Sequence, residues 1–216
     1  FSRTFLRIDT GDICNISTFG SFSYTASDKY KGEGDLNRTN GSGGIVYEPN
    51  DKFKTELFVS NNHDDQNNYY NLTYAETQDL GKYFDKEFNK NISSPNYYGY
   101  NKQDFEDTAL VANIEGELFP DSKISFKPYY LNDNGQYSYT SGANVIKWDM
   151  DHETFGGVLK YEQTFSEEFK TKLGYWMHRQ QPPGPPLDQK KYTVGPKGLS
   201  FAGYAVLADN GYHDFQ

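Results

Sequence analysis

Eight segments of the chain alternate apolar and polar residues with a period of two, and this pattern constrains the possible folds more than any other feature. Such alternation predicts β-strands with one apolar and one more polar face. The clearest segments are 53–60, 110–118 and 169–178, and weaker ones are 2–9, 15–26, 38–48, 123–132 and 152–162. Several exceed the roughly 5–6 residues of a typical soluble strand and reach the roughly 9–11 residues that a tilted strand needs to cross a bilayer.

The connections between these segments alternate in length. Short turns are predicted at 10–12, 49–51, 120–122 and 166–168, and longer connections at 27–37, 62–104, 133–151 and from residue 179 onward. Bacterial outer-membrane barrels combine short periplasmic turns with long extracellular loops. An antiparallel sheet survives in lipid only as part of a closed barrel. The sequence therefore predicts an all-β fold, an antiparallel transmembrane β-barrel segment of about eight strands.

The aromatic residues fit a barrel wall. Aromatic side chains make up 17% of the chain and all hydrophobic residues only 35%, as expected where every second strand residue faces lipid. Interfacial girdles of Tyr and Trp border membrane-spanning structure. The candidates beside the short turns are Tyr47, Phe119, Tyr161 and Phe165, and those toward the longer connections are Tyr24, Tyr130, Tyr175 and Trp176.

Several function classes are disfavoured. The net charge of -9 argues against a nucleic-acid partner. The single cysteine, Cys14, excludes an intrachain disulfide framework. The sequence contains no G-x-S-x-G, H-E-x-x-H or P-loop pattern, so we expect neither an enzyme nor a cofactor.

Three segments of the sequence resemble segments of TonB-dependent outer-membrane receptors. The best matches are Phe22, Tyr24 and the run DKYKG at 28–32, within 17–62. The segments 155–176 and 208–216 are similar to the same family. The resemblance implies a barrel of roughly 22 strands, plugged by an N-terminal domain. It also implies a bacterial outer-membrane location and energy-coupled uptake of a scarce nutrient, with a ferric siderophore as the family's commonest small-molecule ligand.

Residues 1–216 are then expected to be a partial barrel domain, with the plug and the C-terminal barrel strands outside this sequence. The partners implied by the resemblance are outer-membrane lipid, the small-molecule ligand and the TonB complex, which would act through the plug region. Two alternatives stay open. One is a porin-like channel without a plug, in which one long loop folds inward. The other is a soluble secreted β-sandwich that binds sugar through Tyr and Trp.

Candidate ligand-binding residues lie in the longer connections. The connection 62–104 contains six tyrosines suited to an aromatic vestibule, because Tyr offers a flat apolar ring and a hydroxyl at low entropic cost: Tyr69, Tyr70, Tyr74, Tyr97, Tyr98 and Tyr100. The alternative is that these rings pack the loop onto itself. Within the same connection, Thr77 is predicted to cap a short helix carrying Leu80, Phe84 and Phe88.

Other candidates are fewer. Trp148, His178 and Arg179 lie near the expected extracellular ends, where an arginine fork and an indole ring suit an anionic ligand. His63, Asp64 and Asp65 are weak metal candidates without calcium-loop spacing, or simply a solvated loop tip. The Pro- and Gly-rich segment 180–198 is predicted to be an exposed excursion, and the strand-like segment 200–208 after it to be a hairpin within the same loop. Charged residues of the polar faces are expected to line the lumen: Arg3, Arg7, Lys54, Glu56, Glu115, Glu117, Lys127, Lys170 and Lys172.

Overall fold

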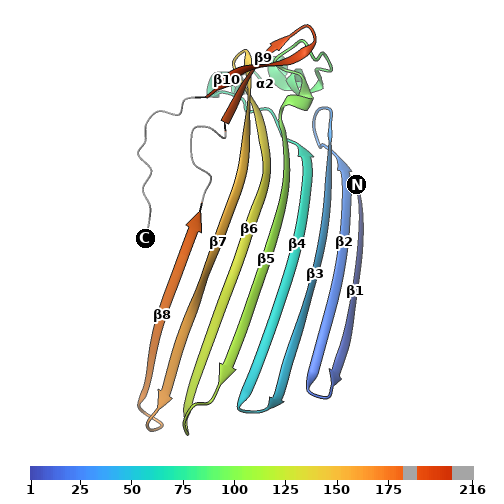
Figure 1. Cartoon of the computed structure of the whole chain (residues 1–216). Helices are drawn as coiled ribbons and strands as arrows, with labels where there is room; N and C mark the ends of the chain where they lie inside the picture. Colours follow the sequence, from blue (N-terminus) through green and yellow to red (C-terminus); the bar gives the residue numbers. More distant parts are fainter. Residues whose placement is uncertain (182–188, 206–216) are drawn as a thin grey trace.

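The computed structural model describes residues 1–181 and 189–205, and these form one sheet of ten antiparallel strands (Figure 1). The strands are β1 (Ser2–Ile13), β2 (Ile16–Asp28), β3 (Asp35–Asn50), β4 (Phe53–Asn67), β5 (Lys102–Gly116), β6 (Ser122–Ser141), β7 (Asn144–Thr164), β8 (Lys170–Gln181), β9 (Gln189–Gly195) and β10 (Gly198–Tyr204). Strands β1 to β8 follow one another as neighbours, and the β9–β10 hairpin joins the upper end of β7.

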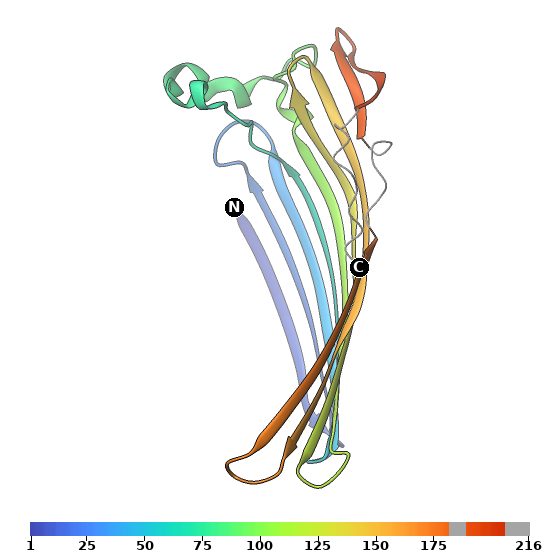
Figure 2. The same cartoon turned by 90° about the vertical axis from the view of Figure 1, so that its left-hand side faces the viewer.

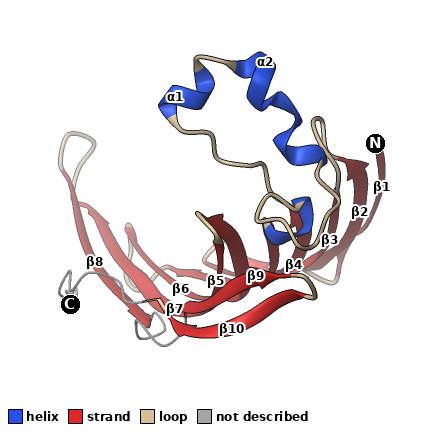
Figure 3. Ribbon diagram, turned by 90° about the horizontal axis from the view of Figure 1, so that it is seen from above, coloured by secondary structure: helices blue, strands red, loops and turns tan. Residues whose placement is uncertain are grey.

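The sheet is curved like a section of a barrel wall (Figures 2 and 3). Within the described residues it does not close, because β1 pairs only with β2 and β8 only with β7. The predicted all-β, antiparallel barrel segment is confirmed. The β-sandwich alternative is wrong for this part of the chain, which forms a single layer.

The first short turn lies later than predicted. Cys14 and Asn15 form it, with φ of 56° and 67°, the left-handed conformations that a type I′ hairpin turn requires at both central positions. The predicted turn at 10–12 is instead a bulge, since the β1–β2 register shifts between Asp9 and Asp12. The other three short turns lie at or next to their predicted positions, between β3 and β4, β5 and β6, and β7 and β8.

The predicted connection at 133–151 is wrong. Strands β6 and β7 continue as a regular ladder up to the pair Ser141 and Asn144. Asn, Asp and Gln occupy both faces here, so the period-two signal disappears although the backbone pairing continues. A hairpin is present, but it begins earlier than predicted. Its first strand, β9, starts at Gln189 inside the predicted excursion, and only its second strand, β10, overlaps the segment 200–208. Residues 182–188 of the excursion and the family-like segment 208–216 lie outside the described residues.

The strand register gathers apolar side chains on one face, which we call the outer face. Ile45, Leu57 and Ala112 are partners in one row, and Leu110, Tyr130 and Phe155 form the row that we call the upper border. Below this border, the described outward positions of β1 to β8 carry no charged side chain by register. Leu57 is 43% exposed and Leu6 58%, so no second layer formed by residues 1–181 and 189–205 covers this apolar band.

The opposite, inner face is more polar and concave. Residues of this face, on strands from β1 to β7, line one cavity of about 910 Å³. Side chains from so many strands can border a single space only on the concave side of a curved sheet. The register places the predicted lumen residues here, except that Glu117 lies in the turn after β5. Ion pairs such as Lys54–Glu56, at 2.8 Å, line the wall. No helix in the described parts of the chain is long and apolar enough to cross a membrane.

Candidate functional site

The cavity on the inner face is the candidate site. It lies toward the end of the sheet that carries the longer loops, and Arg3 and Arg38 supply cationic groups to it. Arg38 Nε donates to Asn62 Oδ1 at 2.6 Å, and Gln103 Nε2 donates to Asp64 Oδ2 at 2.7 Å. These bonds hold the polar side chains in fixed orientations. The cavity therefore presents guanidinium donors, amides and carboxylates to one open concave space.

A row of ionisable groups, of which Asp107 and Asp133 line this cavity, lies just above the upper border of the apolar band. Asp107, Asp133 and His152 are partners on β5, β6 and β7. His152 Nδ1 lies 3.6 Å from Asp133 Oδ2, and Asn62 Nδ2 donates to Asp107 Oδ2 at 3.1 Å. Asp133 Oδ1 is buried without a hydrogen-bond partner. Burial, followed by the neighbouring Asp107 carboxyl, raises the pKa of Asp133 above its usual value.

The long loop between β4 and β5 lies over the concave side of the sheet (Figure 3). It contains the short helices α1 (Tyr74–Thr77) and α2 (Leu80–Tyr83) and the 3-10 turns η1 (Phe84–Phe88) and η2 (Tyr98–Tyr100). The predicted helix is therefore broken into shorter pieces. Its predicted cap is wrong, because Thr73 caps α1 in a reciprocal arrangement with Glu76, and Asp79 caps α2.

A buried ion pair joins this loop to the connection between β2 and β3. Lys29 Nζ lies 3.3 Å from Glu87 Oε2, and the two side chains are only 3% and 5% exposed. Lys31 Nζ lies 3.9 Å from the other carboxylate oxygen, to which the Tyr70 amide also donates at 2.9 Å. We call this arrangement the Glu87 junction.

Backbone contacts complete the Glu87 junction. The Glu33 amide donates to the Glu87 carbonyl at 2.9 Å. Gly32 has φ of +88°, and a side chain there would meet the same carbonyl oxygen at 2.8 Å. The run DKYKG at 28–32 thus has a structural role, which is to dock one loop on another. Sequence reasoning missed Glu87, although two lysines of one run imply an anionic partner.

The six predicted tyrosines mainly stabilise the loop itself. The Tyr97 ring lies 4.9 Å from the rings of both Tyr98 and Tyr100. Tyr100 is 8% exposed, its hydroxyl donates to the Ile92 carbonyl at 2.5 Å, and burial raises its pKa. Tyr69 lies against Lys29 and Tyr70 against Lys86, whereas Tyr74 is 83% exposed. None of the six lines the inner cavity, so their role in ligand capture stays a prediction.

The remaining candidates do not form one group. Trp148 and His178 lie on the inner face by register, and Arg179 lies on the outer face over the Phe155 ring. His178 Nδ1 is 2.9 Å from the Tyr129 hydroxyl, which also accepts from Trp176 Nε1 at 3.1 Å.

The weak metal candidates are separated as well. His63, Asp64 and Asp65 lie in β4 and not at a loop tip, so Asp64 faces inward while its neighbours face outward. His63 pairs with Asp104 at 2.8 Å. Among the described residues, no group of three or more His, Cys, Asp or Glu side chains has an arrangement suited to a metal ion.

Comparison with known proteins bears on the fold alone. No protein-family model matches the sequence, and no curated protein matches it. The structure is similar to that of the ferric citrate transporter FecA in the unliganded form, with a TM-score of 0.73 over 94% of this chain. The sequence identity is 10%, and the chain spans 29% of the length of the FecA chain. This chain thus has the fold of part of a β-barrel wall.

Proposed function

We propose that this chain forms part of the wall of a TonB-dependent outer-membrane receptor. The observation that carries the proposal is the band of uncharged outward residues, which lies below outward residues that are polar or charged. On β2, outward residues are uncharged from Ile16 to Ala26. Ten steps of about 3.3 Å span roughly 33 Å, and a tilt of about 40° reduces this to roughly 25 Å, the height of the apolar band of outer-membrane barrels.

A lipid-facing role also explains why the described part of the chain places no second layer over the outer face. An exposed face with Leu6, Leu57 and Leu110 each at least 42% exposed would be an aggregation hazard in water. In lipid the same face is solvated, while the inner face remains in contact with water. The free edges of β1 and β8 would pair with further strands of the complete barrel, as backbone groups in lipid require.

We place nutrient capture in the inner cavity, beneath the long loop. The guanidinium groups of Arg3 and Arg38 can donate charge-assisted hydrogen bonds to carboxylate groups of a ligand. Asp64, Asp107 and Asp133 line the same cavity and can accept from hydroxyl or amide donors of that ligand. A ferric siderophore is the first ligand to test. Energy coupling through TonB is part of the proposal and would require the plug region outside this sequence.

Uptake assays test this proposal directly. Cells that carry or lack the gene are grown under iron limitation and given labelled ferric siderophores, with and without collapse of the membrane proton gradient. We expect uptake that requires both the gene and the gradient. Arg38→Ala should reduce uptake at low ligand concentration by about tenfold or more, the effect of losing a hydrogen bond to a charged group. The matched control is Arg7→Ala, an inner-face arginine paired with Asp9 outside the cavity.

A plug-less, porin-like channel is the second candidate. It is favoured by the position of the β4–β5 loop over the concave side (Figure 3), as expected of a loop that narrows a pore. Such a channel would pass small solutes down their gradients. Uptake that persists unchanged after collapse of the proton gradient would favour it over the receptor.

A further inference from the structure

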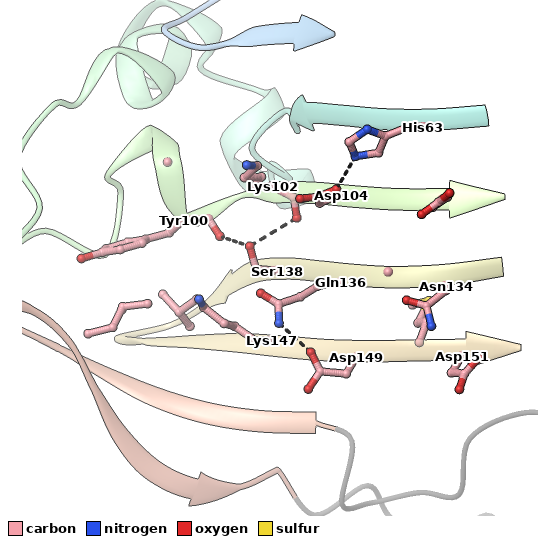
Figure 4. A pocket seen from close by; sticks show the side chains of 16 residues that line it. His63, Tyr100, Lys102, Asp104, Asn134, Gln136, Ser138, Lys147, Asp149 and Asp151 are labelled. Carbon is pink, nitrogen blue, oxygen red and sulfur yellow. Dashed lines mark hydrogen bonds and ion pairs between the residues drawn. The ribbon is translucent and has the colours of Figure 1, made fainter. Parts of the chain in front are cut away.

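A second cavity lies on the outer face, separate from the proposed uptake site. It has a volume of about 860 Å³ and is lined mainly by outward side chains of β4 to β7 (Figure 4). His63 follows Leu57 and Val59 on the same face of β4, and Asn134 follows Tyr130 on β6. The cavity therefore begins one outward row above the upper border, beyond Asn61 and Asn132, on the face that the proposed function turns toward the membrane.

Neighbouring elements close this cavity at its upper end. Tyr100 from the long loop and Leu199 from β10 line it there, and Figure 3 shows the β9–β10 hairpin on the convex side of the sheet. Lys190 of β9 donates to Asp149 Oδ2 at 2.6 Å, which fixes the hairpin against β7. The cavity is thus a groove with one end at the hairpin and the other at the border of the apolar band. We call it the outer groove.

Hydrogen bonds fix the side chains that line the outer groove. His63 Nε2 lies 2.8 Å from Asp104 Oδ1, and Gln136 Nε2 donates to Asp149 Oδ1 at 2.5 Å. Ser138 Oγ donates to the Tyr100 carbonyl at 3.1 Å. Figure 4 shows these groups directed from neighbouring strands into one space. An arrangement held in this way loses little side-chain entropy when a ligand binds.

The chemistry of the lining selects a ligand rich in hydroxyl groups. Carboxylates and amides at close spacing accept from and donate to adjacent hydroxyls. The lining contains four carboxylates and two ammonium groups: Asp104, Glu106, Asp149 and Asp151, with Lys102 and Lys147. Their formal charges sum to -4 + 2 = -2, which disfavours a bare phosphate or another anion. The volume lies within the roughly 300–1,000 Å³ of small-molecule sites.

We infer that the outer groove binds the sugar headgroup of a glycolipid in the surrounding membrane leaflet. The inference rests on the proposed membrane location, and it adds a partner to the outer wall that is independent of the transported ligand. A glycolipid fits because its acyl chains would lie along the apolar band while its sugars lie directly above, at the level of Glu106 and Asp151. A free oligosaccharide would share the hydroxyl chemistry but not the contact with the band.

The test uses the protein purified from the membranes of the cells that produce it. It is placed in lipid nanodiscs that contain a glycolipid, the same lipid without its sugars, or phosphatidylglycerol, and bound lipid is measured by native mass spectrometry. Glu106→Gln with Asp151→Asn removes two carboxylates of the groove. The matched control is Asp51→Asn, an exposed carboxylate in the turn between β3 and β4.

We expect retention of the glycolipid by the parent and the control, and about tenfold or greater loss in the double variant. Equal retention of the sugar-free lipid or phosphatidylglycerol would overturn the inference, as would unchanged retention in the double variant. Binding of free oligosaccharide as tight as that of the glycolipid would overturn the membrane source of the ligand. If the protein is not recovered in membranes at all, the proposed function fails together with this inference.

Discussion

Removing the Lys29 ammonium should release the long loop from the Glu87 junction. Lys29 and Glu87 are 3% and 5% exposed, and removing one partner of a buried ion pair costs about 3–5 kcal/mol. Lys31, at 3.9 Å, and the Tyr70 amide still face the carboxylate in Lys29→Ala. We therefore expect a cost at the lower end of this range, about 3 kcal/mol. It corresponds to roughly a hundredfold more frequent opening of the loop.

Hydrogen–deuterium exchange measures this opening at two amides. The Tyr70 amide donates to the Glu87 carboxylate and the Glu33 amide to the Glu87 carbonyl, so peptides containing them should exchange about a hundred times faster in Lys29→Ala. The matched control is Lys52→Ala. Its partner is Glu117, and because the Lys52 side chain is 71% exposed, its loss should cost less than about 1 kcal/mol. Exchange that changes by less than about threefold in Lys29→Ala would refute the reasoning.

Three further predictions concern the wall and its upper rim. Leu57→Arg, on the outer face, should destabilise the protein in lipid by about 2–4 kcal/mol. Ser60→Arg, on the inner face, should change the unfolding free energy by less than about 1 kcal/mol. Denaturant unfolding in lipid vesicles measures both variants. His63 lies above the apolar band, and its hydrogen bond to Asp104 raises its pKa. The contribution of this pair to the folding stability is therefore complete below about pH 6.5 and is lost as the pH rises through the raised pKa. NMR titration should show that the pKa of His63 falls in Asp104→Asn. Gly156→Ala would place a methyl group against the Met177 carbonyl and the Tyr129 hydroxyl, and should lower the unfolding free energy by about 1–3 kcal/mol, measured by the same denaturant unfolding.

The eight-strand pattern could be predicted because a continuous apolar band imposes a simple rule on one face of the sheet. Where a strand crosses the apolar band, as at Phe53–Val59, every second residue must be uncharged, and the sequence shows this directly. Above the band the rule no longer applies. Polar side chains occupy both faces of the upper parts of β6 and β7, so residues 133–151 look like a loop in sequence although they form a regular hairpin.

The candidate site could be predicted only in part. Composition indicated an aromatic loop, but not that Tyr97 and Tyr100 pack against each other. The partner of Lys29 lies in a different connection, and single-sequence periodicity contains no information on such long-range pairs. Successive side chains of a strand point to opposite faces of the sheet. This separates His63 from Asp64, which looked like one cluster in sequence. Strand register, rather than sequence spacing, decides which charged groups share the inner cavity.

The accessibility of two positions at opposite ends of the wall tests the central claim most directly. Cys14 is exposed in the turn between β1 and β2, and Tyr74 is 83% exposed in the long loop. A membrane-impermeant thiol reagent is applied to intact cells and to permeabilised cells, and Tyr74→Cys is examined in a Cys14→Ser background. The account predicts that Cys14 reacts only after permeabilisation and that Tyr74→Cys reacts in intact cells. Equal labelling of Cys14 in both preparations would contradict a wall that spans the outer membrane with its long loops outside.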